Sequence, residues 1–456
     1  MTTTRTKIAH VFRRLGFGPK PIDIDGWEAA GPEALIENLL NRPAVVPSAA
    51  RPNPWGFLPG TDAAAMNAFV ARQIELMAFG PGASGTGVTS SSYNPLQERI
   101  AWILQGILVT AVVDVTYFVD VADHISLLRS SAFGSYADIL TEMSARPGML
   151  KYLSGYLSTK DHPNQNYARE LMELFSIGRV HPVSGASNYD QGDLQEIARA
   201  LTGYQYNWST GTVSFDPANW DAGPKMFRGQ SIGNAGLQEV VTALTAHPSF
   251  AYFIPLRFYQ ELVGLNPTPG TLDTLADAWG PSGDISALVS TIAHLPEFLS
   301  DAAIYAKVKQ PVELVASAAR LMGAPNLASA NLTLYYYLTL LDQHPMMAPN
   351  VKGWPTGDRY LGENTLTVWS QLAVSLAAPA LSWSGLSSLT PFVQTLYSQG
   401  TPSTAAALAL RLAGFDGANS PSWSYLNDFA TTGTWTALRA ASLASLLLLT
   451  PEFLAC

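Results

Sequence analysis

Two glutamates and an arginine lie close together on one predicted helix, where paired carboxylates can do acid–base chemistry. The helix is expected over residues 165–177, and its polar side chains recur at steps of three and four residues: Asn166, Arg169, Glu170 and Glu173. Charged residues make up only 13% of the chain, so this cluster differs from its surroundings. Two neighbouring carboxylates repel each other when both are ionised, which raises the pKa of one of them. Either glutamate can then serve as a general acid beside the other.

A hydrolase of glycosidic bonds needs such an acid together with a second carboxylate. Three acidic residues downstream are candidates for this second group, namely Asp190, Glu196 and Asp221, and we favour Asp221. We therefore predict that Glu170, Glu173 and Asp221 are the catalytic residues of a hydrolase that acts on extracellular or envelope polysaccharide.

Two irregular segments, residues 204–233 and 343–363, offer aromatic side chains close to polar groups. Flat aromatic faces stack on sugar rings, so Trp220 and Trp354 are predicted to bind substrate, with Lys352 beside the second tryptophan. The same aromatic residues also suit ordinary packing at the edge of a hydrophobic core. Both interpretations remain open at this stage.

A group of cationic side chains near the start of the chain is a further candidate binding element. His10, Arg13 and Arg14 stand at positions that place all three along one helix flank. Two guanidiniums suit a carboxylate, phosphate or sulfate ligand, and Arg13, Arg14 and Arg169 are therefore predicted to bind substrate. They suit the two glutamates of the 165–177 helix equally well. In that case the charges are structural, and the protein is a non-enzymatic scaffold or a secretion-associated binding protein.

Several stretches of the sequence carry a family resemblance: residues 10–18, 147–153, 166–175, 198–204 and 349–354. Together they resemble the signature of the bacterial family called domain of unknown function 1800, and the resemblance spans most of the chain. It implies no activity, because the family is named for lacking an assigned one. The sequence departs from the family pattern at residues 102–106, where relatives usually have a Trp-His-Asn-His-like run, and at 220–221, where they usually have His-Asp.

Composition excludes several classes of partner and cofactor. The net charge of -9 argues against a nucleic-acid-binding protein, which needs a basic face to neutralise phosphates. Cys456 is the single cysteine, so an internal disulfide and a cysteine metal site are excluded. The sequence has no His-Glu-x-x-His spacing, no Walker loop and no dinucleotide-binding Gly-x-Gly-x-x-Gly, so we expect no metal and no cofactor.

The low charged fraction is typical of secreted bacterial proteins, and we expect a secreted or periplasmic location. This chain begins without the apolar run of a signal peptide. Two apolar stretches, residues 100–113 and 443–449, are shorter than the roughly 20 residues that cross a bilayer. They predict buried helices and no transmembrane segment.

Apolar residues recur at three- and four-residue steps along most of the chain, which predicts an all-α fold. We expect a large multi-helix single body with a small β-hairpin insertion near residues 204–233, where turn residues separate short aromatic and β-branched runs. Residues 1–381 are predicted to form a helical core that carries the family motifs. Residues 382–456 are predicted to form a C-terminal helical layer packed on this core.

Overall fold

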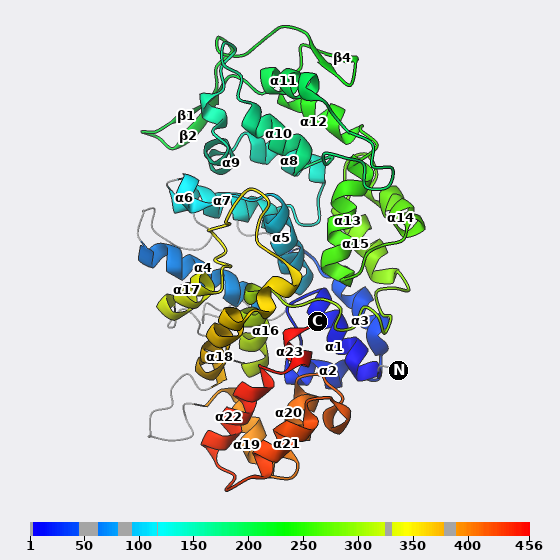
Figure 1. The fold of residues 1–456 in the computed structure, drawn as a ribbon, viewed down its shortest axis with the longest axis vertical. Helices are drawn as coiled ribbons and strands as arrows, with labels where there is room; N and C mark the ends of the chain where they lie inside the picture. The colour runs from blue at the N-terminus through cyan, green and yellow to red at the C-terminus, as the bar shows by residue number, and fades with distance from the viewer. Residues whose placement is uncertain (1–2, 45–62, 81–93, 116, 324–330, 378–388) are drawn as a thin grey trace.

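The computed structural model describes residues 3–44, 63–80, 94–115, 117–323, 331–377 and 389–456. It confirms the predicted all-α class with a small β insertion, because the described part holds 23 α-helices and only short strands. The molecule is elongated, with the helices that follow α7 at one end and the C-terminal helices at the other (Figure 1). The first helices lie in the middle: α1 (Thr4–Arg14), α2 (Pro21–Trp27), α3 (Gly31–Leu40), α4 (Ala63–Phe79), α5 (Pro95–Ile107), α6 (Val112–Val115) and α7 (Phe118–Ser130).

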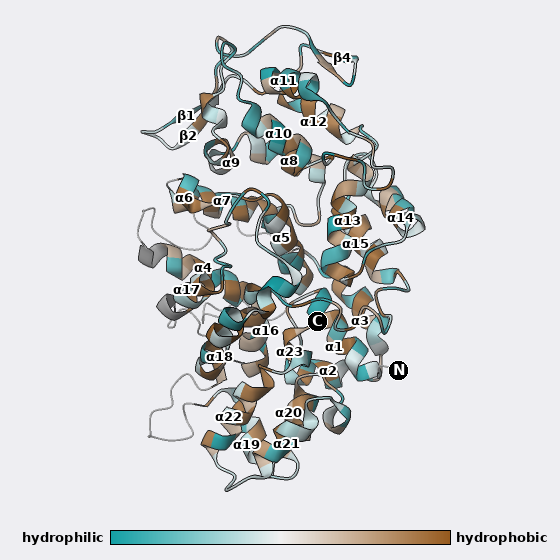
Figure 2. Cartoon of the chain, viewed as in Figure 1, coloured by the Kyte–Doolittle hydropathy of each residue, from teal (hydrophilic) through white to brown (hydrophobic). Residues whose placement is uncertain are grey.

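One end of the molecule carries the predicted polar helix and the β insertion (Figure 1). Its helices are α8 (Tyr136–Ser144), α9 (Pro147–Tyr152), the short 3-10 helix η2 (Gly155–Leu157), α10 (Gln165–Glu173), α11 (Gln191–Ala200) and α12 (Leu237–Thr245). Three helices then return toward α1: α13 (Phe250–Val263), α14 (Pro269–Trp279) and α15 (Ile285–His294). In Figure 2, α10 and α11 each show hydrophilic residues beside hydrophobic ones, as expected of helices with one polar face.

The β insertion consists of two hairpins where the sequence predicted one. Strand β1 (Tyr204–Asn207) pairs antiparallel with β2 (Thr212–Phe215), and β3 (Lys225–Phe227) pairs antiparallel with β4 (Gln230–Gly233). The second hairpin turns through Arg228 and Gly229, which both have positive φ, at 53° and 72°. Consecutive positive φ values are typical of the tight turns that suit the twist of paired strands.

The remaining helices run from the middle of the molecule, where the first two of them lie beside α4, to the other end (Figure 1). They are α16 (Pro311–Met322), α17 (Asn331–Leu340), the 3-10 helix η4 (Gly357–Leu361), α18 (Glu363–Ala377), α19 (Pro391–Gln399), α20 (Ala405–Leu412), the 3-10 helix η6 (Gly417–Asn419), α21 (Trp423–Thr431), α22 (Ala437–Leu447) and α23 (Pro451–Leu454). The predicted boundary at residues 381/382 falls in segment 378–388, outside the described residues. Helix α19 packs against α16, and α22 packs against α18.

Buried side chains form two large apolar clusters. One joins α1, α3 and α8–α15, and the other joins α4 and α16–α23. Helix α5 contributes to both, with Ile100 in the first and Trp102 in the second. Its polar residues are buried too, and they bind neighbouring segments: Arg99 donates to the main-chain oxygen of Arg13 at 2.7 Å, and Gln97 donates to that of Arg129 at 3.1 Å. Helix α5 therefore connects the two apolar clusters.

None of the helices that the structure describes is both long enough and apolar enough to span a bilayer.

Candidate functional site

Helix α10 presents the polar residues predicted from the sequence on a partly exposed face. Asn164 caps its start, because its side chain accepts a hydrogen bond from Asn166 N at 2.8 Å. Tyr167, Ala168, Leu171 and Met172 are buried against the core. Arg169, Glu170 and Glu173 are only partly buried. The carboxylates are thus open to solvent on one side.

Glu170 is held in conditions that favour its protonated form. Burial raises its pKa above the usual glutamate value, and the neighbouring Glu173 raises it further. The positive charges of Arg169 and Lys352 act in the opposite direction but do not cancel the shift. Lys352 comes from the loop that follows α17, so the structure brings this loop to the polar face of α10.

Two tyrosines with raised pKa values lie near these carboxylates. Tyr189 Oη donates a hydrogen bond to Glu173 Oε2 at 2.8 Å, and burial together with Glu173 raises the pKa of Tyr189 to about 12. Burial also raises the pKa of Tyr152 to about 12, with contributions from Asp114 and Glu170. Both phenols therefore remain protonated near neutral pH. Neither tyrosine was predicted from the sequence, since both lie on segments other than the polar helix.

A cavity of about 490 Å³ lies next to this face, between α5, α13 and two later segments. Its wall includes Trp102 and Trp354, which stack with ring centroids 5.5 Å apart and an interplanar angle of 24°. Lys352 also lines the cavity, so the residue that acts on Glu170 belongs to the cavity wall. Arg257 of α13 lines it as well, and Arg257 donates to the main-chain oxygen of Leu174 at the end of α10, at 3.5 Å. The cavity and the polar face of α10 are neighbours.

Gly353 lets the loop approach α5 closely. Its φ is +85°, and a Cβ at this position would lie 2.7 Å from the main-chain oxygen of Gly106. An L-residue pays about 1–2 kcal/mol for this left-handed conformation, and the close contact adds to the cost. Gly353 therefore fixes Lys352 and Trp354 on either side of it.

We expect Gly353→Ala to lower the free energy of unfolding by at least about 1–2 kcal/mol and to change the tryptophan fluorescence, because the loop must move away from α5. Chemical denaturation and fluorescence spectra measure both effects. Gly362→Ala is the matched control, since a Cβ there meets no described atom within 4 Å. Equal stability of the two variants would contradict the role of Gly353.

Arg13 and Arg14 do not pair with the glutamates, which was the alternative to substrate binding that the sequence left open. Arg13 is buried, donates to the main-chain oxygen of Ala413 at 3.1 Å and lies over the ring of Phe415 at 4.6 Å. Arg14 is buried as well and donates to the main-chain oxygens of Ala303 and Cys456. The polar flank of α1 is thus turned into the interior, where main-chain oxygens from distant segments accept its hydrogen bonds.

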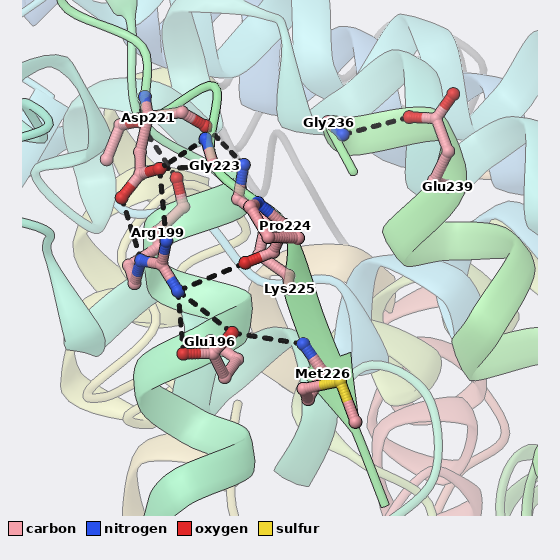
Figure 3. Close-up of polar contacts among 10 residues, drawn as sticks. Glu196, Arg199, Asp221, Gly223, Pro224, Lys225, Met226, Gly236 and Glu239 are labelled. Carbon is pink, nitrogen blue, oxygen red and sulfur yellow. Dashed lines mark hydrogen bonds and ion pairs between the residues drawn. The ribbon is translucent and has the colours of Figure 1, made fainter. Parts of the chain in front are cut away.

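Asp221 belongs to a separate charge cluster that attaches the second hairpin to α11 (Figure 3). Arg199 donates to both of its carboxylate oxygens, at 2.7 and 3.2 Å, and also to Glu196 at 2.8 Å. The hydrogen bond from Arg199 lowers the pKa of Asp221, as do Gly223 N and Lys225. The charges that act on Glu170 are instead those of Glu173, Arg169 and Lys352. The assignment of Asp221 as the second catalytic carboxylate is therefore not supported by its surroundings.

Trp220 lies in the same cluster. The ammonium group of Lys225 sits 4.8 Å from the centre of the Trp220 ring, and Phe215 packs edge-on at 6.0 Å. Protein groups thus already contact this predicted sugar platform. Trp354 is buried against Trp102 and contributes to the cavity wall.

A family model described as "Protein of unknown function (DUF1800)" matches residues 10–455. The chain belongs to this family. No curated protein and no solved structure matches it. Two of the family stretches identified in the sequence, residues 166–175 and 349–354, meet at the site, as α10 and the cavity loop. Residues 102–106, where this chain departs from the family pattern, contribute Trp102, Ile103 and Gly106 to the cavity wall.

Sequence reasoning missed Arg257, Glu261 and Lys307 in the cavity wall. The sequence does contain a signal for Arg257. Arg257 is the single basic residue of a largely apolar predicted helix over residues 250–262, whose other strongly polar residues are Gln260 and Glu261. A lone cation in such a helix needs a partner or a ligand, because burying an isolated charge is costly.

Proposed function

We propose that the protein is a hydrolase of extracellular or envelope polysaccharide, with Glu170 as the general acid. One observation supports this most: Glu170 is a partly exposed carboxyl whose pKa is raised by burial and by Glu173, and Lys352, which acts on it, lines a cavity of about 490 Å³. A general acid has to hold a proton at the working pH, and pairs of carboxylates in unlike surroundings divide the acid and base roles.

The second carboxylate in this proposal is Glu173 in place of Asp221. Its Oε2 accepts a hydrogen bond from Tyr189 Oη at 2.8 Å, which holds the carboxyl group in place. Glu170 gives its proton to the leaving glycosidic oxygen as the bond from the anomeric carbon to that oxygen breaks. Water attacks the anomeric carbon, and Glu173 takes the proton that the water loses. The net reaction adds one water across one glycosidic bond.

The location outside the cytoplasm is also a proposal, and the low charged fraction of the chain supports it. Substrate is proposed to lie over α10 and reach the cavity wall formed by Lys352 and the Trp102–Trp354 pair. Apolar walls with a few charged groups are typical of sites that bind small polar molecules.

A panel of neutral and acidic polysaccharides tests the proposal. The purified protein is incubated with each polymer, and new reducing ends are measured. We expect release from at least one polymer, at a rate proportional to enzyme concentration. Binding of a polymer without release from any of them would overturn the hydrolase and favour the non-enzymatic binding protein.

A further inference from the structure

We infer that the cavity beside α10 binds an anionic group, a carboxylate or a sulfate, through Arg257 and Lys352. The inference rests on the proposed function and narrows it, since the substrate class becomes an acidic polysaccharide. Three features of the wall support it: a partly buried arginine that forms no ion pair among the described residues, a surplus of positive charge, and aromatic side chains beside these charges.

Arg257 is partly buried, and its hydrogen bonds are weak. It donates to the main-chain oxygens of Leu174 at 3.5 Å and Gly106 at 3.3 Å, both long for hydrogen bonds. Among the residues that the structure describes, no carboxylate forms an ion pair with it. Glu261, one turn further along α13, is engaged elsewhere because Lys307 Nζ lies 2.6 Å from its Oε2. A partly buried guanidinium with such weak partners would be stabilised by an anion in the cavity.

The other charges around the cavity leave a positive surplus. Lys307 also binds Glu313 at 2.8 Å, and Glu313 pairs with Arg99. These two cations and the two carboxylates, Glu261 and Glu313, balance. The charges that remain on the wall are those of Arg257 and Lys352, opposed by the exposed Asp358. The wall thus carries one more positive than negative charge, although the whole chain has a net charge of -9.

A second guanidinium lies directly behind the wall. Gly264 lines the cavity at the end of α13, and a Cβ placed on it would lie 2.7 Å from Arg14 Nη2. Arg14 is buried, and its Nε and Nη1 atoms have no hydrogen-bond partner within the described part of the chain. The negative groups that act on Arg14 include Glu313 and Glu261.

The chemistry of the wall suits a charged sugar. A guanidinium matches the two oxygens of a carboxylate or sulfate, and the neighbouring Trp102 and Ile103 offer apolar contacts to a ring. The volume of about 490 Å³ lies within the usual range for small-ligand sites. A uronic acid and a sulfated sugar share this chemistry, and the probes below separate them.

Isothermal titration with D-glucuronate, glucose 6-sulfate, inorganic sulfate and neutral D-glucose tests the inference. We expect at least one of the anions to bind and D-glucose not to bind. Glucuronate binding alone indicates a carboxylated substrate, and binding of the sulfated sugar alone indicates a sulfated one. Failure of all three anions to bind would overturn the inference, as would equal binding of D-glucose.

Arg257→Gln is expected to weaken anion binding by at least about tenfold, since charged hydrogen bonds contribute about 1.5–3 kcal/mol. Lys160→Gln, at an exposed turn, is the control and should bind as the wild type does. If Arg257→Gln fails to fold, Lys352→Gln decides, because Lys352 is exposed and its loss should still weaken binding several-fold. Unchanged affinity in Lys352→Gln, or in folded Arg257→Gln, would contradict the assignment.

The two proposals fail in different ways. Anion binding without hydrolysis of any polymer in the panel leaves the cavity inference standing and overturns the hydrolase. Hydrolysis of neutral polymers without anion binding overturns the cavity inference and leaves the hydrolase standing.

Discussion

Glu170→Gln reduces the rate of polysaccharide hydrolysis by about 10²–10⁴-fold, the usual contribution of a general acid, and leaves the fold unchanged. The amide has nearly the shape of the acid but cannot give up a proton to the leaving oxygen. Because Glu170 is partly exposed, folding should survive the change. Release of reducing ends measures the rate, and circular dichroism with thermal denaturation measures the fold.

Glu363→Gln is the control for this result, since Glu363 is an exposed residue at the start of α18. It should retain wild-type activity. If Glu170→Gln folds and keeps more than a tenth of the wild-type rate, Glu170 is not the acid. If it fails to fold while the control folds, the carboxylate is structural.

Glu313→Gln is expected to cause the largest loss of stability, about 3–5 kcal/mol, which is the usual cost of breaking a buried ion pair by removing one partner. Glu313 is buried in the first turn of α16, where it pairs with Lys307 and Arg99. Its Oε2 also accepts a hydrogen bond from Gln310 N at 2.8 Å, which caps the helix. The variant would leave two buried cations without their shared anion. Urea denaturation measures the free energy of unfolding.

Glu33→Gln is the matched control, because Glu33 also lies in the first helical turn, that of α3, but is exposed. It should change stability by less than about 0.5 kcal/mol, as surface substitutions usually do. A similar loss in both variants would contradict the account of the buried network.

The effect of Glu313 depends on pH in a defined direction. Burial by itself would raise its pKa, but Lys307 and Arg99 outweigh burial and hold the pKa well below the usual glutamate value of 4.5. A carboxyl with a lowered pKa in the folded state contributes stability above its unfolded pKa and loses that contribution as the pH falls below it. The stability difference between wild type and Glu313→Gln should therefore narrow progressively below about pH 4.5.

Local features of the polar helix followed from the sequence. The spacing of Arg169, Glu170 and Glu173 predicted one face, and α10 presents them on one partly exposed face. Its end was predicted at residue 177, but the helix ends at Glu173. At this end the hydrogen bonds no longer join residues four apart, since Phe175 N donates to the main-chain oxygen of Glu170, five residues back. The spacing of hydrophobic residues continues through such a turn, so it cannot locate the end of the helix.

The second hairpin escaped prediction for a similar reason. Its turn places Arg228 at positive φ, a conformation that arginine seldom adopts and that no sequence rule for turns would assign to it. The strands are also only three and four residues long, too short for a clear alternation of apolar and polar side chains.

Contacts between segments far apart in the sequence explain why the partners of Arg13 and Arg14 and the cavity were not predicted. The sequence placed Arg13 and Arg14 on one helix flank but could not name their partners, and Arg13 binds an oxygen 400 positions away. The cavity likewise combines side chains from Trp102 to Asp358. Its key cation, Arg257, stands in a helix whose apolar pattern predicts burial but not the main-chain oxygens around it.

The account depends most on a protonated Glu170, and the pH dependence of kcat/KM in wild type and Arg169→Gln tests this directly. Activity should fall as the pH rises through the pKa of Glu170, because the acid loses its proton. Arg169 lowers this pKa, so its removal should raise it and move the falling limb to higher pH. A falling limb that stays in place, or that moves to lower pH in Arg169→Gln, would contradict the role of Glu170.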